Sequence, residues 1–390
     1  MHQPARPVHV AIDATSLLGQ VTGIGQFTAG LLGGLANQDQ VQVDAFAISW
    51  RRRGEIVEHL PTGISALSRP MPARPLHAAW KVMNWPNLEM FIGIHDVVHG
   101  TNYIVPPTSR ATRIMSVHDL TTVRYPHLCD AKTLRYPDLI RRAVARGAWI
   151  HTDSNFIKQE VCEEFSIDPS KVVTIYPGIP GESKNDGAGG PGSLPEGLSR
   201  ELMSRRIESY VVFVGTIEPR KDLPTLLKAF SLLHVEHSGL GLVIVGRMGW
   251  GQADFETTLA SLDPVIQSKV VVTGYVAQHE RESIISGACC FAYPSLYEGF
   301  GFPPLEAMRL GVPVVSTTQG SIPEVVGDAA ILVDPRNPES LAKAIDGFIS
   351  NDQLNREYVD RGFVQVARFS WERCAVGFVD LYIQCAGLGA

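Results

Sequence analysis

The stretch EGFGFPPLE places two acidic side chains, Glu298 and Glu306, on either side of a turn rich in glycine and proline. Glycines in such a turn leave backbone N–H groups uncovered, and paired prolines suit the first turn of a following helix. Because unpaired N–H groups at a helix N-terminus attract anions, the segment predicts an anion site flanked by carboxylates. Glu306 has a second explanation, since the helix dipole stabilises a carboxylate in the first turn of a helix.

Three further segments could contribute to such a site, and each lies between an apolar strand and a helix. Arg220 and Lys221 in VGTIEPRKDLP could hold a diphosphate, although a solvated pair at a helix start explains them equally well. Gly23 and Gly25 could present N–H groups to a phosphate or a sugar, or simply form a tight turn. His118 ends the strand segment SVHD and faces a ligand-binding edge, but a histidine in this position is as often structural.

Several motifs that hold metals or phosphates are missing from the sequence. It has no D-x-D triplet, no G-x-x-x-x-G-K-[ST] loop, no H-E-x-x-H and no G-x-S-x-G. The six cysteines form no C-x-x-C pair, so we expect buried thiols and no zinc site. A diphosphate site without a metal needs Lys, Arg and helix N-termini to offset its charge. We therefore expect neither a metal nor a cofactor.

Composition limits the class of protein. The chain has 390 residues, of which 45% are hydrophobic and 19% charged, and this suits two soluble domains of about 150 to 200 residues each. We find no run of about eighteen uncharged apolar residues and no signal-peptide pattern, which predicts a cytoplasmic protein. The net charge of -6 argues against a nucleic-acid partner.

Strand and helix patterns alternate along both halves of the chain, which predicts two parallel sheets covered by helices. A segment rich in Gly, Pro and Ser interrupts the alternation and predicts a linker over residues 181–206. The terminal segment FSWERCAVGFVDLYIQC predicts an amphipathic helix that starts near Ser370. Ligands of such sheets bind at the carboxyl ends of the strands, so the loops that follow strands should form the site.

Residues 69–91 combine basic and aromatic side chains. Arg69, Arg74 and Lys81 stand among Trp80, Trp85 and Phe91. Segments of this composition can lie on an anionic bilayer. The alternative is a solvated loop with both tryptophans packed on the core.

Taken together, these motifs resemble those of the nucleotide-sugar glycosyltransferases of the retaining GT-B class, and in particular glycosyltransferase family 4 with its bacterial mannosyltransferases. The most specific mark is EGFGFPPLE followed by AMRLGVPVVST, and GTIEPRKDL resembles the diphosphate loop of that family. The segments IVG and VTGYV resemble its base-binding strands. The resemblance covers nearly the whole chain. It implies an α/β fold with two Rossmann-like domains facing a cleft: an acceptor domain over 1–180, a donor domain over 207–368, and a helix over 369–390 that returns to the first domain.

The resemblance also implies a role for each site residue. Arg220 and Lys221 would hold the donor diphosphate, and Glu298 would accept hydrogen bonds from sugar hydroxyls. His118 would line the sugar pocket near the anomeric carbon, and Glu306 would bind the ribose hydroxyls. The remaining donor-binding residues that it implies are Gly23, Gly25, Gly215, Arg247, Tyr275, Phe300, Gly301 and Phe302. The family often has Gly-Arg where this chain has Gly215-Thr216, so Arg247 is a second candidate for the cationic clamp.

The activity implied is metal-independent transfer of a hexose with retained configuration, with leaving-group stabilisation as the main catalytic effect. By general likeness the donor would be GDP-mannose, with UDP-sugars next. The acceptor would be a glycan or a polyprenyl- or other lipid-linked sugar in surface polysaccharide or lipopolysaccharide synthesis. The protein would then sit in the cytoplasm, with peripheral contact at the inner face of an anionic membrane. Two alternatives remain: a non-hydrolysing nucleotide-sugar epimerase, and a non-catalytic sugar-nucleotide binding protein.

Overall fold

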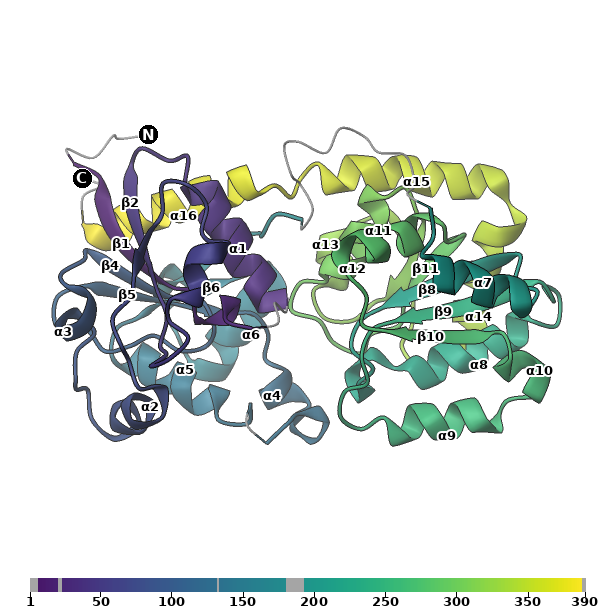
Figure 1. Ribbon diagram of the computed structural model, residues 1–390, viewed down its shortest axis with the longest axis horizontal. Coiled ribbons are helices and arrows are strands. Elements are labelled where there is room, and N and C mark those ends of the chain that lie inside the picture. Colours follow the sequence, from purple (N-terminus) through teal and green to yellow (C-terminus); the bar gives the residue numbers. More distant parts are fainter. Residues whose placement is uncertain (1–5, 20–22, 132, 180–192, 388–390) are drawn as a thin grey trace. The chain divides into compact units, whose positions relative to one another are not determined.

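The computed structural model describes residues 6–19, 23–131, 133–179 and 193–387. These residues form two compact α/β units (Figure 1). The first contains the described residues within Met1–Arg124, Ala131–Pro180 and Phe369–Ala390. The second contains Tyr125–Asp130 and the described residues within Gly181–Arg368.

A seven-stranded sheet forms the centre of the first unit, and its strand order is β3-β2-β1-β4-β5-β6-β7. Every pair of neighbours is parallel, as the alternation of strand and helix patterns predicts. The chain order reverses between β1 and β4, which makes this the crossover point of the sheet. The strands are β1 (Val8–Asp13), β2 (Val41–Phe46), β3 (Ser65–Leu67), β4 (Val97–Gly100), β5 (Thr112–Val117), β6 (Trp149–Thr152) and β7 (Val172–Thr174).

Two hydrophobic clusters cover the two faces of this sheet. Alternate residues of β1 divide between them, since Val10 and Ile12 belong to one cluster and Ala11 to the other. The larger cluster includes Phe27 of α1 and Phe378 of α16. The helices of this unit are α1 (Gly23–Leu35), α2 (Ala73–Val82), α3 (Glu89–Ile92), α4 (Thr121–Arg124), α5 (Tyr136–Ala145), α6 (Asn155–Phe165) and α16 (Trp371–Ala386).

The second unit has a six-stranded parallel sheet with the order β10-β9-β8-β11-β12-β13. Its crossover point lies between β8 and β11. The strands are β8 (Ser209–Val214), β9 (Leu240–Val245), β10 (Val270–Gly274), β11 (Cys290–Tyr293), β12 (Val314–Thr317) and β13 (Ala330–Val333). The helices are α7 (Glu196–Ser204), α8 (Leu223–Leu233), α9 (Ala253–Ser261), α10 (Pro264–Gln267), α11 (Gln278–Ser286), α12 (Phe302–Arg309), α13 (Ile322–Val326), α14 (Pro338–Ser350) and α15 (Asp352–Val366), with a short 3-10 helix, η5 (Pro219–Lys221).

Two local predictions need correction. The linker predicted over 181–206 is too long, because α7 lies in its second half and buries Leu198 and Leu202; residues 180–192 lie outside the described part of the chain. Trp80 and Trp85 do not share one environment. Trp80 is 7% exposed and donates from Nε1 to the carbonyl oxygen of Pro86 at 2.8 Å, whereas Trp85 is 57% exposed.

The C-terminal helix α16 packs on α1 within the first unit. It starts where the sequence predicts, because the Ser370 side chain caps it by accepting a hydrogen bond from the backbone N–H of Arg373. Two glycines of α1 make the close approach possible. A Cβ atom on Gly30 would lie 2.1 Å from the Trp371 ring, and one on Gly34 would lie 2.5 Å from the Trp371 carbonyl oxygen.

This packing predicts opposite effects for two identical substitutions in α1. Gly30→Ala should lower the free energy of unfolding by about 1–3 kcal/mol, because the methyl group overlaps the Trp371 ring. Gly33→Ala is the matched control, since a Cβ there meets no atom within 4 Å. It should be neutral or stabilise by up to about 1 kcal/mol through helix propensity. Chemical denaturation measures both values, and equal effects would contradict the packing role of Gly30.

Candidate active site

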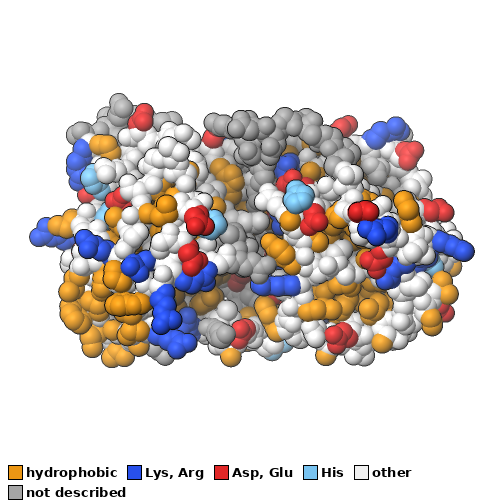
Figure 2. Space-filling model, in the orientation of Figure 1, with side chains coloured by type: hydrophobic (Ala, Val, Ile, Leu, Met, Phe, Trp, Pro, Cys, Tyr) orange, Lys and Arg blue, Asp and Glu red, His pale blue; other side chains and the backbone are white. Residues whose placement is uncertain are grey.

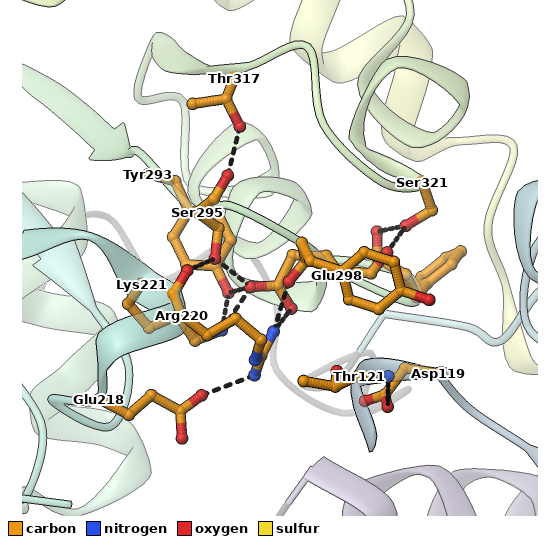
Figure 3. A network of polar contacts seen from close by, with 12 residues as sticks. Asp119, Thr121, Glu218, Arg220, Lys221, Tyr293, Ser295, Glu298, Thr317 and Ser321 are labelled. Atoms are coloured by element: carbon orange, nitrogen blue, oxygen red, sulfur yellow. Dashed lines mark hydrogen bonds and ion pairs between the residues drawn. The ribbon is translucent and has the colours of Figure 1, made fainter. Parts of the chain in front are cut away.

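Predicted site residues of the second unit gather at the carboxyl ends of β8 and β11, on either side of the crossover point. The loop after β8 carries Arg220 and Lys221 in η5, and the loop after β11 carries Glu298. Figure 3 shows these three side chains pointing toward one another. Parallel sheets bind ligands at such a point because the flanking loops diverge there.

Both carboxylate oxygens of Glu298 have partners. Oε1 accepts from Lys221 Nζ at 2.6 Å, from the Tyr293 hydroxyl at 3.1 Å and from the Ser295 hydroxyl. Oε2 lies 2.8 Å from Arg220 Nη1. Only 7% of Glu298 is exposed. Glu298 therefore holds two cations that come from a different loop.

Charge compensation fixes the protonation states of this cluster. Burial raises the pKa of Glu298, but Arg220 and Lys221 outweigh it and lower the value to about 2. Burial and Arg220 lower the pKa of Lys221, and Glu298 opposes the shift. Arg220 also donates to Glu218 at 2.7 Å. With Glu298 ionised and hydrogen-bonded at neutral pH, the cluster pairs two positive side chains with two negative ones.

The turn between Glu298 and α12 contains a left-handed backbone position, and side-chain hydrogen bonds support it. Gly301 has a φ of 103°, a left-handed value that favours glycine, and α12 begins directly after it. The Ser321 hydroxyl donates to the carbonyl oxygens of Glu298 and Phe300, at 3.0 Å each. Phe300 is buried, and its ring lies edge-on to that of Phe302. The hydrogen bonds from Ser321 and the burial of Phe300 therefore fix the conformation of the turn.

Glu306 has a different environment from Glu298. It is the fifth residue of α12 and lies in the second turn, so the first-turn dipole explanation for it is wrong. It is 4% exposed, and its Oε1 lies 3.2 Å from Arg281 Nη2. Burial raises the pKa of Glu306 to about 7, and Arg281 and Arg309 offset only part of this effect. Glu306 therefore titrates near neutral pH.

The other predicted donor-binding residues follow neighbouring strands. Gly215 follows β8, and its N–H donates to the carbonyl oxygen of Val245 at 2.9 Å. Arg247 and Tyr275 follow β9 and β10 and are exposed. It is Arg220 and Lys221, and not Arg247, that pair with Glu298.

Three predicted residues belong to the first unit. Gly23 is the first residue of α1, and Gly25 is buried two residues later. His118 follows β5, where its Nδ1 lies 2.6 Å from Asp153 Oδ2 and its Nε2 lies 2.7 Å from the carbonyl oxygen of Thr101. Its side chain is 12% exposed.

Sequence reasoning missed several residues that complete the site of the second unit. Glu218, Tyr293, Ser295 and Ser321 all bond to predicted residues or to the turn. Tyr293 and Ser295 carry a sequence signal, because Tyr293 ends β11 and Ser295 lies in the short loop between β11 and Glu298. Ser321 carries none, since its place under the turn depends on the packing of α13.

Two other features lie apart from the predicted residues. Among the described residues, one group of three side chains could hold a metal ion. The ligand atoms of Glu236, His237 and Asp346 lie within 4.8 Å of one another, and none of the three is a predicted site residue. A cavity of about 380 Å³ lies beside η5, lined by Glu218, Asp222 and Arg336 but by none of the predicted residues. Metal independence stays a prediction.

Two doubly wound parallel sheets, with a charged cluster at the crossover point of the second, give the chain the fold of the GT-B glycosyltransferase structures. The chain superposes on WaaG, a glycosyltransferase involved in lipopolysaccharide biosynthesis, with a TM-score of 0.69 and 15% identity, covering 96% of this chain and 99% of WaaG. It superposes on HepE from Anabaena, solved with UDP and glucose, with a TM-score of 0.68 and 16% identity, covering 97% and 100%. At these identities the likeness concerns the fold.

Sequence comparisons identify the family. The model "Glycosyltransferase Family 4" matches residues 21–182, and "Glycosyl transferases group 1" matches residues 199–364. The chain is 28% identical over 318 residues to O-antigen chain mannosyltransferase B of Escherichia coli, covering 79% of this chain and 77% of that protein. It is 26% identical over 362 residues to O-antigen chain mannosyltransferase RfbU of Salmonella typhimurium, covering 90% and 93%. The chain belongs to the family 4-like glycosyltransferases.

The two buried glutamates predict opposite contributions to stability as pH changes. The folded pKa of Glu306 is raised to about 7, so its contribution to stability falls as pH rises from the unfolded value of 4.5 through 7. Glu306→Gln removes that loss. Relative to the wild type, the variant should gain about 3 kcal/mol between pH 5 and pH 8.

Glu298→Gln is the matched control for this experiment. The folded pKa of Glu298 is about 2, so its stabilising contribution is lost only as pH falls from 4.5 toward 2. The stability difference between this variant and the wild type should stay constant from pH 5 to pH 8. Denaturant unfolding across this pH range tests both statements, and a flat difference for Glu306→Gln would show that Glu306 does not titrate near 7.

Proposed function

We propose that the protein transfers mannose from GDP-mannose, with retained configuration, to a glycan or lipid-linked acceptor in surface polysaccharide synthesis. The observation that carries the proposal is the buried cluster of Arg220, Lys221 and Glu298 at the crossover of β8 and β11. The mannosyl donor is favoured by two relatives named as O-antigen chain mannosyltransferases. These relatives favour transfer over the alternatives of an epimerase or a non-catalytic binding protein.

The cluster suits stabilisation of a leaving diphosphate. Negative charge grows on the diphosphate as the glycosidic bond breaks, and preorganised cations lower the energy of that state. Lys221 and Arg220 are already oriented by Glu298, so they need no rearrangement. In this proposal the protein uses them in place of a metal.

Glu298 is unsuited to act as a covalent nucleophile. Its pKa of about 2 reflects strong pairing with two cations, which lowers its basicity. Its Oε1 already accepts three hydrogen bonds, and its Oε2 keeps acceptor capacity for a sugar hydroxyl. We assign Glu298 two tasks, orienting the cations and accepting from the donor sugar.

The remaining donor contacts follow the family pattern. Glu306 would bind the ribose hydroxyls in its ionised form, and the N–H groups near Phe300, Gly301 and Phe302 would meet the sugar or the phosphate. Gly215, Arg247 and Tyr275 would line the rest of the nucleotide site. Gly23, Gly25 and His118 of the first unit stay candidates for donor binding.

The proposal predicts transfer of mannose from GDP-mannose in excess chelator, with slower or no transfer from UDP-sugars. Lys221→Ala should weaken nucleoside diphosphate binding by about 1.5–3 kcal/mol, the range for a charge-assisted contact, as measured by calorimetry. Loss of activity in chelator that magnesium or manganese restores would reject metal independence.

Arg247→Ala is the control for the cationic clamp. Arg247 is exposed and does not pair with Glu298 through any contact in the described structure, so its removal should weaken binding less than Lys221→Ala. If Lys221→Ala binds normally while Arg247→Ala does not, the clamp is assigned to the wrong loop. An isomerised donor without transfer would instead identify an epimerase.

A lipid-linked acceptor would bring the protein to a membrane surface. No helix in the described part of the chain is long and apolar enough to cross a bilayer. Contact would therefore be peripheral. We propose that it uses an exposed apolar surface formed by Val82, Met83, Trp85, Met90 and Ile94, which we call the α2–α3 surface.

Three observations favour an anionic membrane as the partner of the α2–α3 surface. Its five apolar side chains are each at least half exposed within thirteen residues of sequence. Arg69 and Arg74 are exposed on or beside α2, and Arg110 is exposed where its N–H donates to Glu89 at the start of α3. Figure 2 shows Lys and Arg side chains next to a hydrophobic region over α2 and α3. Trp80, which the sequence placed in this contact, is instead part of the core below it.

Vesicle binding tests this surface. The protein should co-sediment with vesicles containing anionic lipid and release as salt rises, since each basic residue near the surface contributes about 1 kcal/mol. Val82→Asp should weaken binding because it places a negative charge in the apolar surface. Val235→Asp is the matched control, because Val82 and Val235 are 81% and 83% exposed and Val235 lies in the second unit.

Two outcomes would overturn the membrane contact. The first is no binding to anionic vesicles at low salt, which would favour a soluble acceptor. The second is that Val82→Asp leaves vesicle binding unchanged but abolishes self-association in sedimentation velocity, which would make the α2–α3 surface an interface between copies of the chain.

A further inference from the structure

Three histidines lie close together in the core of the first unit. His99 on β4 and His151 on β6 are fully buried, and His118 follows β5. The ring of Phe27 contacts two of them, stacking on His151 and meeting His118 edge-on. Buried ring nitrogens need partners, so the bonds between these histidines reveal their protonation.

His99 and His151 belong to a chain of hydrogen bonds that has only one direction. The carbonyl oxygen of Ile175 can only accept, so His151 Nε2 donates to it at 3.0 Å. Because burial lowers the pKa of His151 to about 4, the ring is neutral and its Nδ1 accepts from the Ser116 hydroxyl at 2.9 Å, while Ser116 in turn accepts from His99 Nε2 at 2.8 Å. The chain ends on α16, where the Tyr382 hydroxyl donates to His99 Nδ1 at 2.8 Å. Both histidines are neutral with one proton each.

Burial agrees with this assignment. It lowers the pKa of His151 to about 4 and that of His99 well below its ordinary value. Burial also raises the pKa of Tyr382, so its hydroxyl keeps the proton that it donates. The neutral chain runs from Tyr382 on α16 to the carbonyl oxygen of Ile175, which follows β7.

His118 differs because the Thr101 carbonyl oxygen and an ionised Asp153 both accept. Nε2 faces the carbonyl oxygen of Thr101 at 2.7 Å, and Nδ1 faces Asp153 Oδ2 at 2.6 Å. A neutral imidazole has one donor and one acceptor nitrogen, so it cannot satisfy a carbonyl oxygen and a carboxylate together. Asp153 is 3% exposed, and its Oδ1 has no hydrogen-bond partner among the described residues. His118 is the one hydrogen-bond partner of this side chain among the described residues, and His151 Nε2 lies 3.8 Å from Oδ1.

We propose that Asp153 is a positioning residue that holds His118 as an imidazolium, a fixed positive charge at the carboxyl edge of the first sheet. A buried ion pair contributes little to stability in itself, which makes a functional reason for keeping it the better account. In the reaction, which rests on the proposed function, this charge would attract negative charge on a ligand bound at the carboxyl edge of the first sheet. With both nitrogens already donating, His118 does not serve as a general base.

The charges around His118 favour this state. Burial opposes the imidazolium, but the charge and hydrogen bond of Asp153, the Thr101 carbonyl and Asp119 raise the pKa of His118 above its ordinary value. The other titratable groups that face it are His99 and His151, which are neutral. Phe27 and Tyr103 supply aromatic rings beside it and no charge.

The test compares two variants of the full chain in which the imidazole of His118 is retained. Asp153→Asn removes the negative charge at nearly constant volume. NMR titration of labelled histidine, with the His118 signal assigned by its absence in His118→Gln, should show His118 titrating at lower pH than in the wild type. Mannose transfer should fall at least about tenfold at neutral pH, through kcat and not KM.

Tyr382→Phe is the structural control. Tyr382 is fully buried, and its loss breaks the neutral chain while leaving Asp153 and His118 in place. It should lower stability but leave the His118 titration and kcat within about twofold. Equal losses of kcat in both variants, or an unchanged His118 titration in Asp153→Asn, would overturn the proposal. If the wild type transfers no sugar, the proposed function is wrong. The titration still determines the protonation state of His118 in that case.

Discussion

The ion pairs between Glu298 and two cations are the interaction on which the ligand edge of the second unit depends. Lys221 and Arg220 come from the loop after β8, and Glu298 comes from the loop after β11, so the pairs fasten the two sides of the crossover point together. Lys221 and Glu298 are buried, and the loss of Glu298 would leave Lys221 without its ion-pair partner. In the proposed function, the same pairing would also orient the cations toward a diphosphate.

The two glutamates of EGFGFPPLE show how environment separates equal side chains. Glu298 precedes the turn and meets two cations at 2.6 and 2.8 Å, so it is ionised down to very acidic pH. Glu306 lies in the helix after the turn and meets Arg281 at 3.2 Å, which leaves the cost of its burial largely uncompensated. One segment therefore supplies a permanent charge and a carboxylate that titrates near neutral pH.

The fold follows from local sequence patterns, while the pairing within the site does not. Buried apolar strands and amphipathic helices predict both parallel sheets, and Ser370 marks the start of α16 correctly. The pairing of Lys221 with Glu298 spans 77 residues and depends on β8 lying beside β11, which no local pattern encodes. The prediction that Trp80 and Trp85 share one environment is wrong for a related reason. Both stand in one basic, aromatic segment, and only the direction of the chain after α2 buries one and exposes the other.

Both units place charged side chains directly after their strands, but they compensate them differently. In the second unit, Arg220 pairs with Glu218 and with Glu298, so the positive charges are shared among several partners. In the first unit, His118 forms an ion pair with one carboxylate, Asp153, to which Asp119 adds a smaller charge effect, and the neighbouring histidines are neutral. A charge with a single partner responds fully to the loss of that partner, whereas a shared charge is buffered by those that remain. Changes at the carboxyl edge of the first sheet should therefore alter protonation more sharply than changes of equal size at the second.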